Sequence, residues 1–180
     1  MASALGKIGG PAAPRSVSEA NELNDLHFMN EALAEARIAG LEGEVPIGAV
    51  LVRDGEIIGR GRNRRERGGD PLAHAELEAI RAASGVTSGW RLEGTTMFVT
   101  LEPCAMCAGA LVASRVERLV FAAADPKAGF CGSLGNLVID PRLNHRLVVE
   151  SGLLEEESAA LLTDFFRRLR GGEELIEADR

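Results

Sequence analysis

Apolar and polar positions in the first third of the chain follow a helical period and then a strand pattern. Between about residues 21 and 40, apolar side chains recur every three or four residues, which predicts an amphipathic helix. These side chains are Leu26, Met29, Leu33 and Ala36. The apolar run 47–52 has the length of a strand, and the pair Asp54–Gly55 is typical of a tight turn. We therefore expect a helix and then an antiparallel hairpin, with the return strand starting at residue 57.

The rest of the chain alternates between strand-like and helical patterns. Three further segments are rich in β-forming residues, at 96–101, 117–122 and 147–149. Helical patterns flank them, at 70–85, 104–114 and 154–170. Strands that alternate with helices after an opening hairpin predict an α/β fold, in which helices cover both faces of a mixed sheet.

Both ends of the chain lack these patterns. Residues 1–20 are rich in Ala, Gly, Ser and Pro and are expected to be a disordered extension, and residues 171–180 form an acidic tail. The 180 residues suffice for one domain with a sizeable core, which we place at 21–170. No apolar run approaches the ~18 residues needed to span a bilayer. No secretory leader is recognisable either, so we expect a cytoplasmic protein that does not partner a membrane.

Charge is distributed unevenly along the chain. The net charge of −7 disfavours general nucleic-acid binding, because neutralisation of phosphates drives that affinity. The segment 60–67 is nevertheless crowded with arginines, namely Arg60, Arg62, Arg64, Arg65 and Arg67. A solvated loop after a strand and a phosphate-binding patch are equally compatible with this cluster. Asn63 within it is either a turn residue or a contact for a base edge.

Two short motifs contain the residue types of a metal centre. One residue separates His74 from Glu76, and two residues separate Cys104 from Cys107. One imidazole and two thiolates suit zinc, and three protein ligands leave open the fourth position of a catalytic site. We expect both motifs at helix starts, the first helix beginning at Asp70–Pro71, and the helix dipole favours thiolates. The combined pattern, with a proline before the first cysteine, is the signature of zinc-dependent base deaminases.

This arrangement indicates hydrolytic chemistry. Zinc held by His74, Cys104 and Cys107 would activate water for attack on a ring carbon that bears an exocyclic amine. Glu76 would carry a proton from the water to the ring nitrogen and later to the departing ammonia. A structural zinc site and a redox pair are the alternatives for Cys-x-x-Cys alone, and a redox pair leaves the His and Glu unexplained. We expect Cys131 to be a packing residue rather than a fourth ligand.

Longer segments around these motifs match a known family. The segments are 44–50, 70–76, 100–110, 144–146 and 161–167, which read EVPIGAV, DPLAHAE, TLEPCAMCAGA, NHR and LLTDFFR. From about residue 26 to residue 168 the chain thus resembles the bacterial tRNA-specific adenosine deaminases, within the cytidine-deaminase-like superfamily. The zinc motif is common to the superfamily. The Phe-Phe-Arg stretch and the loop around Asp125 and Lys127 point to the tRNA branch.

The resemblance implies a three-layer α/β/α cytidine-deaminase-like fold with about five strands, and deamination of the wobble adenosine of an arginine tRNA to inosine. It also implies one Zn²⁺ per subunit, no organic cofactor, a homodimer, and the tRNA anticodon loop as partner. The expected contacts to the target base are Asn63, Val45 and Pro46. The expected contacts to neighbouring loop nucleotides are Asp125, Lys127, Phe165, Phe166 and Arg167. The amide of Cys104 is expected to stabilise charge on the attacking oxygen.

Two alternatives remain. A deaminase of a free base or nucleoside, such as guanine or cytosine, would share the fold, the zinc and Glu76. The net charge of −7 favours that substrate, whereas the basic clusters at 60–67 and 167–170 favour RNA. A non-catalytic, zinc-stabilised binding module is the other alternative, and it needs no carboxylate at position 76.

Overall fold

A single mixed sheet forms the centre of the protein. The computed structural model describes residues 17–87 and 89–172. Its five strands lie in the order β2-β1-β3-β4-β5. They are β1 (Gly48–Arg53), β2 (Glu56–Arg62), β3 (Thr95–Leu101), β4 (Arg118–Ala123) and β5 (Val148–Ser151). β1 runs antiparallel to β2 and β3, whereas β3, β4 and β5 are mutually parallel. The predicted mixed sheet is confirmed.

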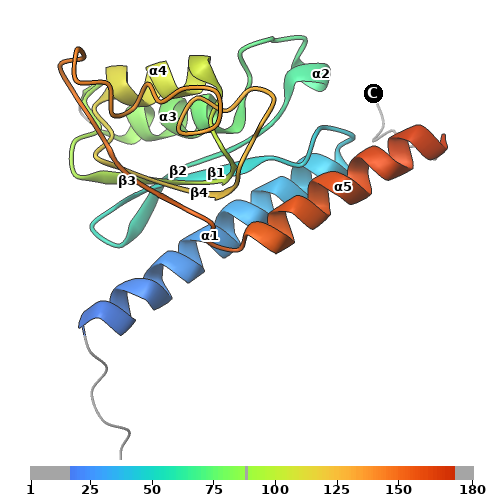
Figure 1. The fold of residues 1–180 in the computed structure, drawn as a ribbon, viewed down its shortest axis with the longest axis horizontal. Helices are drawn as coiled ribbons and strands as arrows, with labels where there is room; N and C mark the ends of the chain where they lie inside the picture. Colours follow the sequence, from blue (N-terminus) through green and yellow to red (C-terminus); the bar gives the residue numbers. More distant parts are fainter. Residues whose placement is uncertain (1–16, 88, 173–180) are drawn as a thin grey trace, which may run out of the picture.

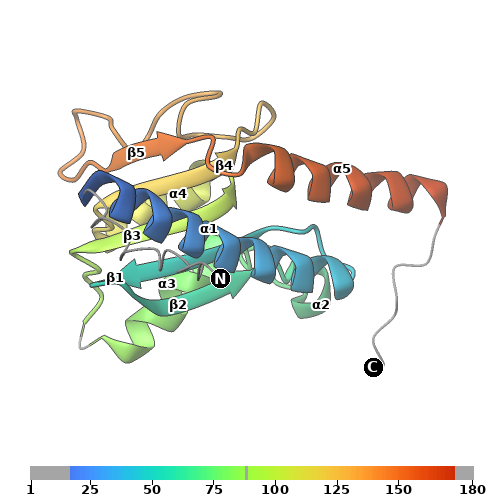
Figure 2. The ribbon, with the colours of Figure 1, turned by 90° about the horizontal axis from the view of Figure 1, so that it is seen from below.

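Helices cover both faces of this sheet. They are α1 (Val17–Leu41), α2 (Arg65–Gly68), α3 (Ala75–Val86), α4 (Ala105–Ser114) and α5 (Glu155–Gly171). Figure 1 shows α3 and α4 on one face and α1 and α5 on the other, which confirms the three-layer α/β/α arrangement. Seen from the α1 side, α5 extends beyond the edge of the sheet (Figure 2). Among the helices of the described ranges, none combines the length and the apolar character needed to cross a bilayer.

Alternation along the strands divides the core into two layers. One layer, packed under α3 and α4, includes Leu51, Met97 and Leu119, all without exposed surface. The neighbouring strand positions Val50 and Phe98 point to the opposite face and pack with α1. Because successive side chains of a strand point to opposite faces, these buried strands have apolar residues at consecutive positions.

Several boundaries differ from the sequence-based prediction, and the short helix α2 was not predicted. α1 begins at Val17 rather than at residue 21. β2 continues to Arg62, so the first arginines of the 60–67 cluster belong to a strand instead of a loop. The start of α3 at Asp70–Pro71 was wrong, because the Asp70 carboxylate accepts a hydrogen bond from the Leu72 N–H at 2.8 Å and closes a turn there. Of the expected extension and acidic tail, residues 1–16 and 173–180 lie outside the described residues.

Helix α3 lies directly against the backbone of β2. A Cβ added at Gly61 would come within 2.0 Å of the Ala75 carbonyl oxygen, and one at Gly59 within 2.3 Å of the Ala79 carbonyl oxygen. The absence of a side chain at Gly59 and at Gly61 therefore sets the distance between β2 and α3. Since His74 caps α3, this contact also fixes the position of the first predicted metal ligand.

Replacing Gly61 by Ala is expected to push α3 away from the sheet, with a loss of stability of about 1–3 kcal/mol, the usual cost of overpacking. Denaturant unfolding measures this loss. Gly85→Ala is the matched control, because Gly85 lies in α3 itself and a Cβ there meets nothing within 4 Å. That control is expected to gain about 0.5–1 kcal/mol from the better helix propensity of Ala. Equal stabilities of the two variants would contradict the packing described here.

Candidate metal centre and base pocket

Two helix starts bring the predicted ligands together. His74 is the N-cap residue of α3 and Cys104 is the N-cap residue of α4, both with extended backbone conformations. Cys107 lies in the first turn of α4 and is fully buried. Helix N-termini present unpaired N–H groups and the positive end of the helix dipole, so both ends favour anionic ligands.

The three ligand atoms have the spacing of a zinc site. His74 Nδ1 lies 3.6 Å from Cys107 Sγ and 3.8 Å from Cys104 Sγ. All three atoms lie within 4.8 Å of one another. Tetrahedral zinc with ordinary bond lengths separates its nitrogen and sulfur ligands by about 3.6 Å. The three side chains therefore fit a zinc ion without rearrangement.

The surroundings of the two thiols shift their pKa values in opposite directions. Hydrogen bonds with Cys107 and His74 lower the pKa of the Cys104 thiol to about 3. The same contact with Cys104, together with burial, raises the pKa of Cys107. Cys104 is thus held as a thiolate, which is the form that binds metals.

The carboxyl group of Glu76 lies beside these ligands. Its residue is only 4% exposed, and the charges of His74 and Cys104 are among the influences on its pKa. Burial is the largest influence on Glu76 and raises its pKa. A carboxyl group in this environment accepts and retains a proton more readily than an exposed one, as proton transfer requires.

A pocket of about 210 Å³ opens onto this centre. His74, Glu76 and Cys104 line it together with three of the predicted substrate-binding residues, Val45, Asn63 and Asp125. Arg65 of the arginine cluster lines it too. Further lining residues were not singled out from the sequence, namely Ile47, Ala75, Leu101, Glu102 and Ala128. Four of these residues are apolar, namely Ile47, Ala75, Leu101 and Ala128, and their sequence signal is indistinguishable from that of ordinary packing residues.

The remaining predicted residues lie outside this pocket. Pro46 and Phe165 line a groove of about 300 Å³ where α5 passes the end of α1. Phe166, Arg167 and Lys127 are exposed. The chain segment 45–46 contributes to both hollows, because Val45 lines the pocket and Pro46 the groove.

Comparison with known proteins identifies the family. A profile of the MafB19-like deaminases matches residues 23–170. The chain belongs to the MafB19-like deaminase family. The tRNA-specific adenosine deaminase of Bacillus subtilis strain 168 is 55% identical over 146 residues, which cover 81% of this chain and 91% of that protein. The predicted resemblance to the tRNA-specific adenosine deaminases is thereby confirmed.

Solved structures of other deaminases share the fold of this family member. One comes from work on A-to-I editing by tRNA:A34 deaminases at the wobble position, with 48% identity and a TM-score of 0.73, and covers 76% of this chain and 99% of its own. A guanine deaminase from Nitrosomonas europaea is 23% identical with a TM-score of 0.68, and the match covers 89% of this chain and 98% of that one. The second likeness concerns the fold alone.

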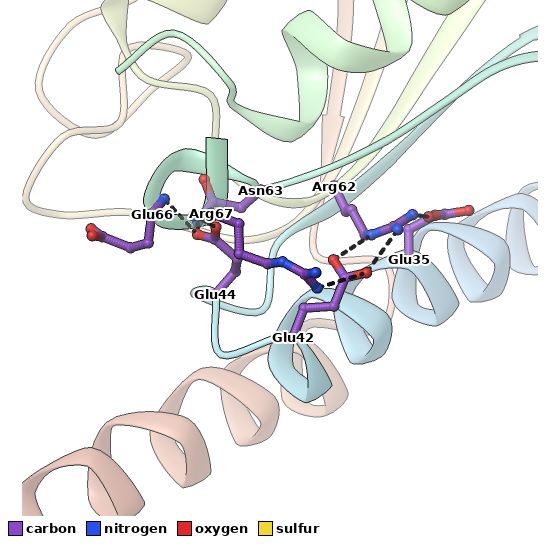
Figure 3. Close-up of polar contacts among 7 residues, drawn as sticks. All are labelled: Glu35, Glu42, Glu44, Arg62, Asn63, Glu66 and Arg67. Carbon is purple, nitrogen blue, oxygen red and sulfur yellow. Dashed lines mark hydrogen bonds and ion pairs between the residues drawn. The ribbon is translucent and has the colours of Figure 1, made fainter. Parts of the chain in front are cut away.

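The arginine cluster divides into two groups. Arg60 pairs with Glu31 at 2.6 Å, and Arg62 pairs with Glu42 at 3.0 Å. Arg67 also lies 3.6 Å from Glu42 (Figure 3). In the described ranges, Arg64 and Arg65 form no ion pair and are exposed. Three of the five arginines thus hold β2 and α2 to α1 and its following loop, and two remain for a ligand.

Glu102 organises the loop on the other side of the pocket. The residue is 3% exposed, and its carboxylate accepts hydrogen bonds from the N–H groups of Asp125, Cys131 and Ser133 at 2.9–3.0 Å and from the Ser133 hydroxyl. Gly129 packs so closely that a Cβ there would come within 2.3 Å of the carboxylate. Burial raises the pKa of Glu102, but these hydrogen bonds outweigh it and lower the pKa. The stabilisation that Glu102 provides is therefore present above the pKa of the unfolded chain and is lost as the pH falls through the lowered folded value.

Cys131 fits the predicted packing role in this loop. It is buried, and its Sγ lies 3.8 Å from the Pro103 carbonyl oxygen. The group of metal-ligating atoms found in the described residues consists of His74, Cys104 and Cys107.

Replacing Glu102 by Gln is expected to destabilise the protein by about 2–3 kcal/mol, because the amide nitrogen would face N–H donors and leave some of them unpaired. Hydrogen exchange should accelerate at residues 125–133. Ser133→Ala is the milder comparison: it removes the hydroxyl donor alone and should cost about 1 kcal/mol. A Gln variant as stable as the native chain would show that these bonds do not hold the loop.

Proposed function

We propose that this protein hydrolyses adenosine to inosine and ammonia at the wobble position of a tRNA, an arginine tRNA by the family resemblance. The observation that carries the proposal is a group of three zinc-type ligand atoms at a pocket that a buried glutamate and Asn63 line. The 55% identity to a tRNA-specific adenosine deaminase supports the choice of substrate. A homodimer in the cytoplasm is part of the proposal and can be checked by light scattering and cell fractionation.

The residues of the metal centre divide the chemistry between them. His74, Cys104 and Cys107 would hold Zn²⁺, which activates water when bound in such a site. Glu76 takes a proton from the attacking water and passes it to the ring nitrogen next to the reacting carbon. It then takes the second proton from the added hydroxyl group and gives it to the amino group, which leaves as ammonia. The N–H groups at the start of α4 stabilise negative charge that develops on the attacking oxygen.

The pocket is suited to a single base. Its volume of about 210 Å³ accommodates one base that has been turned out of a single-stranded loop, not a stacked pair. In this proposal Asn63 hydrogen-bonds the edge of the adenine and Val45 contacts one of its faces, whereas Pro46 lies in the neighbouring groove.

The surface around the pocket would hold the anticodon loop. Phe166 is 40% exposed, and aromatic rings of this kind stack with unpaired bases. Lys127 and Arg167 offer exposed positive charge to phosphates, although Arg167 also pairs with Asp164. Asp125 and Phe165 complete the predicted set of loop contacts.

Glu76→Ala is expected to retain one zinc per chain and to lose deamination by roughly 10²–10⁴-fold or more, because the ligands remain and the proton carrier does not. Metal analysis and inosine formation measure the two properties. Glu78→Ala is the matched control, since Glu78 lies on the same helix and pairs with Arg81 instead of facing the ligands. A fully active Glu76→Ala variant would contradict the mechanism.

The choice of substrate is tested by offering RNA and small molecules to the same preparation. We expect inosine to form in an anticodon stem-loop with adenosine at the wobble position, and no turnover of free adenosine, guanine or cytidine. Turnover of a free base without any on the stem-loop would favour the alternative function as a small-molecule deaminase.

Replacing Arg64 and Arg65 by Ala is expected to weaken stem-loop binding and to flatten its salt dependence, by about 0.7 in the log–log slope for each phosphate that is no longer neutralised. Titrations at several salt concentrations measure the slope. Arg60→Ala is the control, because that side chain is already paired with Glu31 and should leave the slope unchanged. Equal slopes for the native chain, the double variant and Arg60→Ala would show that the arginine cluster is an ordinary solvated surface.

A further inference from the structure

Glu44 is a buried carboxylate that the chemistry above does not use. It has no exposed surface, and it lies in the turn that connects α1 to β1. Its backbone N–H donates to the Ala39 carbonyl at 2.9 Å, and the preceding Gly43 has a φ of +80°, a conformation that favours glycine. The backbone thus holds this side chain in a defined position, next to Asn63 of the base pocket.

The contacts of Glu44 are hydrogen-bond donors from the far wall of the pocket. One carboxylate oxygen accepts from the Arg67 N–H at 2.8 Å. The other accepts from the Glu66 N–H at 3.2 Å and from the Asn63 side-chain nitrogen at 3.3 Å. Figure 3 shows Glu44 between Asn63 and the start of α2. One carboxylate therefore holds both Asn63 and the short helix that begins at Arg65.

These contacts determine which way the Asn63 amide faces. An ionised carboxylate only accepts hydrogen bonds, so Asn63 must turn its NH₂ group toward Glu44. Its Oδ1 and second N–H are then left for the pocket that Asn63 lines. Asn63 is only 5% exposed, and its backbone N–H donates to the Ile47 carbonyl at 3.0 Å. A reversed side-chain amide would bring Oδ1 against the Glu44 carboxylate and lose the hydrogen bond between Asn63 and Glu44.

We propose that Glu44 is a positioning residue that fixes the pattern of donor and acceptor that Asn63 presents to the substrate base. Bases differ at their edges in the order of donors and acceptors, so a fixed amide selects one pattern and a reversed amide the opposite one. The identity of the selected base rests on the proposed function. The fixation of the amide does not, because it follows from contacts within the chain.

A double-mutant cycle tests this role. The variants are Glu44→Gln, Asn63→Ala and the two combined, assayed for kcat and KM with the wobble stem-loop. The amide introduced by Glu44→Gln can either accept from or donate to Asn63, so it no longer dictates the orientation of the Asn63 side chain. Glu42→Gln is the matched control, because Glu42 lies in the same network but contacts Arg62 and Arg67 rather than Asn63.

We expect Glu44→Gln to lose kcat/KM by roughly 10- to 100-fold, the usual effect of misplacing a group that orients a substrate. Its zinc content should stay unchanged. In the combined variant the loss should be close to that of Asn63→Ala alone, because Glu44 acts through Asn63. Independent losses that multiply, full activity of Glu44→Gln, or an equal loss in Glu42→Gln would overturn the proposal.

A measurement without substrate separates this proposal from the proposed function. The side-chain amide signals of Asn63 in a ¹⁵N NMR spectrum are those that are missing from the spectrum of Asn63→Ala. The proton that faces the carboxylate should resonate downfield and move upfield in Glu44→Gln. An unmoved signal overturns the positioning role, whatever the substrate is. If the native chain acts on a free base instead of RNA, the same kinetic cycle is carried out with that base.

Discussion

The convergence of three ligand atoms from two helix starts is the constraint on which the rest of the structure depends. His74 and Cys104 cap helices that follow different strands, and their ligand atoms lie 3.8 Å apart. The ligands can meet only if both helices lie at a fixed height above one sheet. Gly59 and Gly61 set that height for α3, because β2 has no side chain at these positions to hold the helix away. The apolar layer beneath α3 and α4 then fixes both helices together.

Three buried glutamates surround the pocket, and their surroundings give them different tasks. Glu44 and Glu102 both accept hydrogen bonds from several backbone N–H groups, so they fix the walls of the pocket. These bonds lower the pKa of Glu102. Glu76 lies beside the ligands instead, and burial raises its pKa. In the proposed function one residue type therefore supplies both fixed anchors and a proton carrier in a single site, because the three side chains have different surroundings.

The sequence predicted the five strands, the four longer helices and the candidate metal ligands, but neither α2 nor the residues that support the site. Alternation and helical periodicity depend on local spacing, and the ligand motif depends on a fixed order of residues, so both can be recognised without coordinates. Glu44 and Glu102 were missed as anchors, because their donors lie 19 to 31 residues away in the chain. The start of α3 was wrong because a side-chain bond from Asp70 closes a turn before the helix. The arginine cluster could be divided only after α1 had been found to carry the partners of Arg60 and Arg62.

The central claim is that three protein ligands hold the metal and that Glu76 stays free to move protons. Crystals of the zinc-loaded protein, with anomalous scattering measured at the zinc edge, test it most directly. We predict one strong peak within bonding distance of His74 Nδ1, Cys104 Sγ and Cys107 Sγ, and no fourth bond from the protein. A fourth protein ligand, whether Cys131 or the Glu76 carboxylate, would contradict the account, because the site would then be closed.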